Sequence, residues 1–344
     1  AEGHKALGLA FTSRARYRSA LASYMEALQV DPNHPSATAN VGVMLMRFGS
    51  LDESLLWTRR TLRVAPDLML ARANLAWNYL ALEEWALAEE WGRETTRLAP
   101  EIVHGHEALA FAAGAQGRLE EGLRLAEEIV EVDRDAPARW QFAAEMAALA
   151  GDWGKVVRYS REALDLVPGG GIPPWHFPGT TLGYALIQLG QIDEGRNHLS
   201  SVWGSLTATI DAGSDDPRLA WEMGCVLAAE GALAEALEWL ERGFEEGWRW
   251  AAVVELDPVL GSLRDTREFI DLQATLRFEV EAMRRRVLAQ RPLPVANPTD
   301  SINVPVLTSP GMSGESARSR IPFSYASSAR RRPALVGTSA PIPK

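Results

Sequence analysis

The stretch MLARANLAWNYLALEEWALAEEWGRETTRLAPEI, residues 69–102, combines features that indicate two helices joined by a short turn. Small Ala76 is followed twelve residues later by small Ala88, and large Trp85 lies between them. Small side chains at these two positions let the two helix backbones approach closely and cross. Pro100 then ends the second helix, because proline lacks a backbone donor and clashes with the preceding turn.

The same features recur at a constant interval along the chain. A first column of small residues, spaced 34 apart, contains Gly8, Gly42, Ala76, Ala110 and Ala144. A second column, twelve residues after the first, contains Ala20, Ser54, Ala88, Gly122 and Val156. Gly49, Gly117 and Gly151 lie where a residue with positive φ would end the first helix at low cost. Because one helix pair cannot bury its own apolar face, neighbouring pairs must stack, and the period predicts a helical array.

These columns resemble the tetratricopeptide repeat (TPR) family. The resemblance implies an all-α, right-handed α-solenoid of about seven helix–turn–helix units with a C-terminal capping helix and an extended tail. Residues 251–266 resemble a segment that often closes bacterial arrays of this family. The expected organisation is units one to five in 1–168, units six and seven in 169–250 after a Gly/Pro insertion, a capping segment and helix in 251–290, and a Pro/Ser/Arg-rich tail in 291–344.

Composition and motifs exclude several classes of function. A net charge of -10 argues against nucleic acid as the main partner. The single cysteine, Cys225, excludes a disulfide framework and a cysteine-based zinc site. The sequence contains no run of 18 uncharged apolar residues, no HExxH, no phosphate-binding loop and no nucleophile elbow. We therefore expect a protein that is not an enzyme and has no cofactor and no metal.

The compartment stays open. Removal of Met, export processing or trimming would each give a chain that starts at Ala1, and no leader of the basic–apolar–small type is present. The cytoplasm is slightly favoured over export to the periplasm.

In the TPR family, the first helix of each pair lines a concave groove, and two columns of this chain face it. Asn40 and Asn74 lie two residues before the small residues Gly42 and Ala76, at a groove-facing position where an amide can pair with the backbone of an extended peptide. Lys5 lies where a chaperone-binding subset places a lysine for a C-terminal carboxylate, although Leu9, Leu70 and Asn74 do not match that clamp. Alternatively, the two asparagines cap or bridge neighbouring helices.

The groove-facing column one residue after the small residues of the first helices is mostly apolar. It supplies Trp77, Phe111 and Tyr184 as candidate anchors for a partner, with Glu145 in the same column. The alternative is that these residues pack against neighbouring first helices of a tight superhelix. Trp175, in the Gly/Pro insertion, is either part of a recognition loop at the groove or a plug between units five and six.

The function that these features predict is a non-catalytic scaffold or adaptor that holds a peptide or helix of a partner and stabilises a multi-protein assembly. Residues 291–344 carry a net charge of +5, with five candidate contact residues: Arg318, Arg320, Arg330, Arg331 and Arg332. Three contacts of this tail stay open: with a partner, with its own acidic solenoid or with an anionic membrane. The alternative function is a peripheral accessory subunit of a membrane complex, such as an electron-transfer complex, tethered by the tail. A third class is a regulatory subunit of an enzyme encoded nearby.

Overall fold

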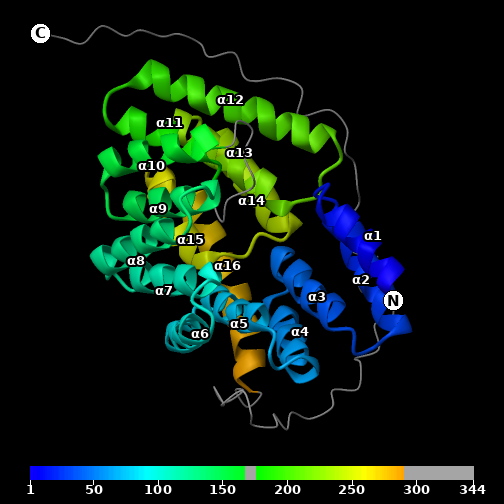
Figure 1. Cartoon of the computed structure of the whole chain (residues 1–344). Helices are drawn as coiled ribbons and strands as arrows, with labels where there is room; N and C mark the ends of the chain where they lie inside the picture. Colours follow the sequence, from blue (N-terminus) through cyan, green and yellow to red (C-terminus); the bar gives the residue numbers. More distant parts are fainter. Residues whose placement is uncertain (167–175, 290–344) are drawn as a thin grey trace, which may run out of the picture. The chain divides into compact units, whose positions relative to one another are not determined.

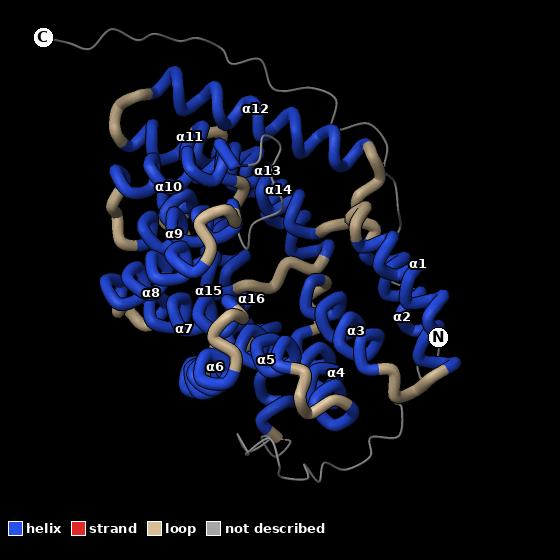
Figure 2. Tube along the Cα trace, in the orientation of Figure 1, coloured by secondary structure: helices blue, strands red, loops and turns tan. Residues whose placement is uncertain are grey.

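The computed structural model describes residues 1–166 and 176–289, all within the first of two units into which the chain divides, Ala1–Ile302. Every regular element of these residues is helical (Figures 1 and 2). Seven pairs of helices follow one another: α1(Glu2–Thr12) and α2(Tyr17–Val30), α3(Pro35–Arg47) and α4(Leu51–Val64), α5(Met69–Ala81) and α6(Trp85–Leu98), α7(Val103–Ala115) and α8(Leu119–Val132), α9(Pro137–Leu149) and α10(Trp153–Leu166), α11(Pro178–Gln188) and α12(Ile192–Asp211), α13(Pro217–Glu230) and α14(Leu233–Glu246).

The small-residue columns hold the two helices of each pair together. A Cβ atom added to Gly42 would lie 3.0 Å from the Thr58 hydroxyl, and one added to Gly195 would lie 2.6 Å from the Gly183 carbonyl. Larger side chains at these positions would separate the helices. The all-α solenoid predicted from the 34-residue period is confirmed, with α5 and α6 covering the stretch that first indicated it.

The turns within the first five pairs share one backbone conformation. Gly49, Gly117 and Gly151 have φ of 73°, 82° and 73°, as their position predicted. Ala15 and Glu83, which lie 34 residues from Gly49 on either side, have φ of 52° and 58°. The repeat geometry therefore imposes a left-handed turn residue even where the sequence supplies no glycine.

Some predicted features lie outside the described residues. These are most of the Gly/Pro insertion with Trp175, and the tail with its five candidate arginines. Within the described residues, no helix is both long enough and apolar enough to cross a membrane.

Three further elements follow the seventh pair: α15(Ala251–Leu256), η1(Pro258–Leu263) and α16(Arg267–Leu288). Asp257 begins η1, where its carboxylate accepts a hydrogen bond from the Val259 N–H at 2.9 Å. We call residues 248–263 the closing segment. α15 lies among the helix pairs, whereas α16 packs beside α4 and α14 (Figure 1).

The seventh pair and the capping helix contact the first three pairs. Asp215, just before α13, accepts hydrogen bonds from the N–H groups of Tyr17 and Arg18 at 2.5 and 2.9 Å, and so caps α2. On α16, Arg286 pairs with Asp52 at 2.6 Å and Arg284 with Glu84 at 2.5 Å. The N-terminal repeats are thus joined to the C-terminal end within this unit.

Two glycines allow this closure. Gly49, in the turn between α3 and α4, and Gly247, after α14, have φ of 73° and 123°. A Cβ on Gly49 would lie 2.3 Å from the Gly247 carbonyl, and one on Gly247 would lie 2.6 Å from the Phe48 carbonyl. The two turns therefore interlock at backbone contact, which only glycine permits.

Candidate functional site

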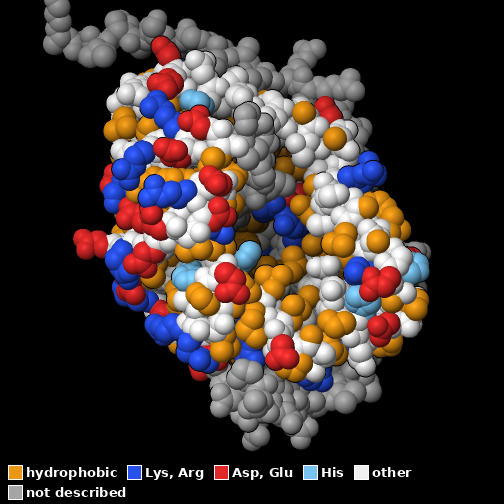
Figure 3. Space-filling model, in the orientation of Figure 1, with side chains coloured by type: hydrophobic (Ala, Val, Ile, Leu, Met, Phe, Trp, Pro, Cys, Tyr) orange, Lys and Arg blue, Asp and Glu red, His pale blue; other side chains and the backbone are white. Residues whose placement is uncertain are grey.

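The inner face of the solenoid is open at one end and covered at the other. In the column predicted to carry the anchors, Leu9 is 49% exposed and Val43 is half-buried. Further along, Trp77, Phe111 and Glu145 are 8%, 1% and 4% exposed. Figure 3 shows hydrophobic side chains gathered over α3 and α5. Partner-accessible surface in this column is therefore concentrated on the first two pairs.

The closing segment covers the remaining positions. The ring of Trp77 meets that of Trp250 edge to face, with ring centroids 5.6 Å apart. The Tyr184 hydroxyl donates to the Pro258 carbonyl at 2.7 Å. Phe111 lines a small cavity together with Val253, Leu256 and Pro258 of the closing segment. The inner face from the third pair onward thus holds a helix of its own chain.

At the open end, the predicted peptide-binding residues are accessible. Lys5 is half-buried and pairs with Glu2 at 2.5 Å, and Glu2 also contacts His34 at 2.9 Å. The amide of Asn40 is half-exposed and makes no hydrogen bond to the part of the chain that the structure describes. Its donor and its acceptor are both available to a peptide backbone.

Asn74 lies on the same column but is buried. It is 9% exposed, and its backbone carbonyl accepts a hydrogen bond from the side-chain amide of Asn78 at 2.7 Å. The Asn78 amide also reaches the Thr58 hydroxyl of the preceding pair at 3.2 Å. The bridge between neighbouring pairs is therefore made by Asn78, and Asn74 is buried one turn before it on the same helix.

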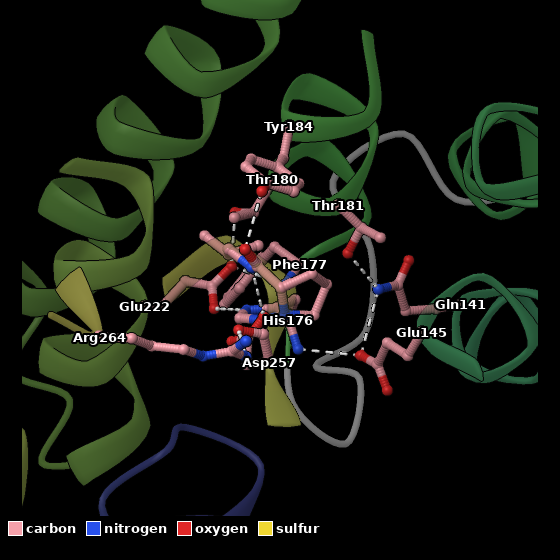
Figure 4. Close-up of polar contacts among 12 residues, drawn as sticks. Gln141, Glu145, His176, Phe177, Thr180, Thr181, Tyr184, Glu222, Asp257 and Arg264 are labelled. Carbon is pink, nitrogen blue, oxygen red and sulfur yellow. Dashed lines mark hydrogen bonds and ion pairs between the residues drawn. The ribbon is translucent and has the colours of Figure 1, made fainter. Parts of the chain in front are cut away.

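A buried polar cluster lies where the closing segment meets the sixth and seventh pairs (Figure 4). The imidazole of His176, just before α11, contacts two carboxylates. Its Nδ1 lies 2.9 Å from Oε2 of Glu222 on α13, and its Nε2 lies 2.8 Å from Oδ2 of Asp257. All three side chains are almost fully buried.

Other groups of the chain hold these carboxylates in place. Glu222 Oε1 accepts from the Phe177 N–H at 2.8 Å and from the Thr180 hydroxyl at 2.5 Å. Asp257 Oδ1 caps η1, and its backbone carbonyl accepts from Arg264 at 3.0 Å. Both carboxylates are therefore fixed on one oxygen and present the other to His176.

Burial and neighbouring charges shift the pKa values of the groups in this cluster. Burial lowers the pKa of His176, but the charges of Asp257 and Glu222 outweigh burial and raise the pKa well above its usual value. Burial raises the pKa of Glu145 on α9 to about 7. Glu145 Oε1 accepts from the backbone N–H of His176 at 2.9 Å, whereas Oε2 has no partner among the described residues. The imidazole therefore bridges two carboxylates whose charges favour its protonated form.

The cluster also groups potential metal ligands. A ring nitrogen of His176, a carboxylate oxygen of Glu222 and Sγ of Cys225 lie within 4.8 Å of one another. In the sequence, His176 follows Trp175 of the Gly/Pro insertion and Glu222 and Cys225 lie some 46 to 49 residues later, and nothing connected them. The only available signal was the spacing of Glu222 and Cys225, three apart on one helix face.

Comparison with known proteins gives similarity at the level of TPR structures only. No family model and no curated protein matches the sequence. A thermophilic TPR protein of Thermus thermophilus is 17% identical with a TM-score of 0.46, over 48% of this chain and 91% of that one. PilW, a type IV pilus biogenesis factor, is 16% identical with a TM-score of 0.47, over 59% and 92%. YrrB, a TPR protein with an unusual peptide-binding site, is 19% identical with a TM-score of 0.34, over 48% and 85%.

Because these similarities are low, the repeat type is recognised from features of this chain itself. The first five helix pairs repeat at intervals of about 34 residues, and the sixth and seventh follow after longer intervals with the same close packing of small residues, features typical of tetratricopeptide-type repeats.

Proposed function

We propose that this protein is a non-catalytic interaction scaffold that binds a peptide of a partner protein on the inner face of its first two helix pairs. Lys5, Leu9, Asn40 and Val43 form this surface, which we call the open end. Asn40 pairs with the peptide backbone, and Leu9 and Val43 supply apolar contact. The covered residues Trp77, Phe111, Glu145 and Tyr184 lie beside the closing segment, and Asn74 is buried.

The observation that carries the proposal is the change of exposure along one column. Leu9 is half-exposed, whereas Phe111, three pairs further on, is 1% exposed beside the closing segment. Equivalent positions of the repeat are thus accessible in the first two helix pairs, whereas the closing segment of the same chain covers them from the third pair onward. The covered part supports the mode of binding, because there the inner face already accommodates the short helix α15.

Peptides selected against the full chain test this proposal. A phage-displayed library of random peptides is panned on the wild-type protein, and the affinity of the selected peptides is measured by fluorescence anisotropy. We expect Asn40→Ala to weaken binding by about 5- to 10-fold, the value of one or two hydrogen bonds. Leu9→Glu should weaken it more strongly, because it places a charge on the apolar surface.

Phe278→Ser on α16 is the control, since Phe278 is 76% exposed and far along the chain from the open end. Its affinity for the selected peptides should equal that of the wild type. Peptides that bind Asn40→Ala and Leu9→Glu as tightly as wild type, or that fail to bind Phe278→Ser, would contradict the proposal.

A further inference from the structure

We propose that His176, Glu222 and Cys225 form a binding site for one divalent transition-metal ion of the zinc type. The ligands are Nδ1 of His176, Oε2 of Glu222 and Sγ of Cys225, three donor atoms from two separate segments. This inference is independent of the proposed peptide-binding surface, because it concerns the opposite, covered part of the inner face.

The donor set fits such an ion. Zinc binds imidazole nitrogen, carboxylate oxygen and thiolate sulfur at about 2.0–2.3 Å, so its ligand atoms lie up to about 4 Å apart. The three groups lie within 4.8 Å of one another, and Nδ1 and Oε2 are 2.9 Å apart. An ion would therefore move Nδ1 and Oε2 slightly apart and draw Sγ closer. A single cysteine cannot build a cysteine-only site, but in this cluster it adds a soft donor to a harder nitrogen and oxygen, a mixture that suits zinc, cobalt or iron(II).

The groups around the donors orient them for a metal. Asp257 contacts Nε2 of His176 at 2.8 Å, so the coordinating nitrogen is Nδ1, and the ion would enter between Nδ1 and Oε2 of Glu222, which now contact each other at 2.9 Å. A carboxylate on the second nitrogen of a metal-bound histidine is a common outer-shell arrangement. Glu222 is held through Oε1 by Phe177 and Thr180, which leaves Oε2 for the ion.

An ion that binds here replaces protons on its ligands. Imidazole nitrogen and sulfur coordinate a metal without their protons, so any proton on Nδ1 or Sγ leaves to solvent as the divalent ion enters. The positive charge of the ion is thereby partly offset at a place where all three side chains are buried.

Cobalt(II) spectroscopy on the full chain tests the proposal. We expect Co²⁺, added to the reduced protein, to produce a sulfur-to-cobalt charge-transfer band in the near ultraviolet that saturates at one ion per chain. Zn²⁺ should abolish the band by competition. Because Cys225 is the only cysteine of the sequence, the wild-type spectrum alone shows whether its thiolate binds the ion.

Variants then separate the ligands from their surroundings. Cys225→Ser should remove the band, and Glu222→Gln should weaken cobalt binding while leaving an acceptor for Phe177 and Thr180. Asp257→Asn keeps an oxygen to cap η1 and should weaken binding about 10- to 100-fold with the band retained. His198→Ala, which changes a histidine of α12 outside the cluster, is the matched control and should bind like wild type. Absence of the band in the wild-type protein, or an unchanged band in Cys225→Ser, would overturn the assignment.

Discussion

At the scale of single residues, two glycines of α12 are expected to respond in opposite ways to the same substitution. A Cβ on Gly195 would lie 2.6 Å from the Gly183 carbonyl and 2.8 Å from Ile187, whereas Gly204 has open space around it. Gly195→Ala should therefore lower the free energy of unfolding by about 1–3 kcal/mol through overpacking. Gly204→Ala should raise it by about 1 kcal/mol, because alanine is the better helix former. Urea denaturation measures both, and a change of the same sign in the two variants would contradict the packing described for this pair.

A second residue, Asp216, should make stability depend on acid pH. Burial would raise its pKa, but Arg218 at 2.7 Å and Arg47 at 3.0 Å outweigh burial and lower the pKa to about 2. Since the folded-state pKa is below the unfolded value, the stabilisation is complete above about pH 4 and is lost as the pH falls towards 2. The loss should amount to about 2 kcal/mol.

The measurement is the free energy of unfolding between pH 5 and pH 2 for wild type and Asp216→Asn. The variant should be less stable than wild type at pH 5 and should approach it at pH 2. Parallel curves for the two proteins would show that the ion pairs with Arg47 and Arg218 do not contribute.

At the scale of elements, helix α2 depends on a cap from another repeat. Asp215 accepts from the N–H groups of Tyr17 and Arg18, 198 and 197 residues away in sequence. Asp215→Ala should lower the free energy of unfolding by about 1–2 kcal/mol, as expected for loss of an N-cap. Hydrogen exchange should accelerate at the first turn of α2. Asp211→Ala, at the exposed end of α12, is the control, and equal protection of α2 in both variants would argue against the cap.

At the scale of the whole described unit, contact between its two ends should make unfolding more cooperative than in an open array. An open solenoid is stabilised only by neighbouring repeats, so its terminal repeats fray. Here Gly49 of the second pair touches Gly247 beyond the seventh. Gly49→Ala should therefore release α1–α4 to exchange and unfold separately from the rest.

Gly117→Ala is the matched control for this prediction. Gly117 has a φ of 82°, similar to the 73° of Gly49, but no atom lies within 4 Å of an added Cβ. Both variants carry the strain of a left-handed alanine, about 1–2 kcal/mol, and only Gly49→Ala breaks the interlock. Hydrogen exchange followed by mass spectrometry distinguishes them, and equal protection of α1–α4 in the two variants would contradict the closure.

The sequence by itself determined the helices, their pairing and the number of repeats. These depend on contacts within about 34 residues, so small residues such as Ala76 and Ala88 and turn residues such as Gly49 report them through regular spacing. The same spacing predicted which positions face inward, including Asn40 and Trp77. It predicted the direction of a side chain but not what that side chain meets.

Only the tertiary structure decided which inward positions are accessible. Trp77 is covered by Trp250, and His176 meets Asp257 from 81 residues away. These contacts depend on how small rotations between successive repeats accumulate until one end of the array reaches the other. A repeat pattern specifies how one helix pair packs on the next, but not the accumulated rotation along the array. For this reason, the polar cluster around His176 and the separation into an open and a covered inner face are seen only in the tertiary structure.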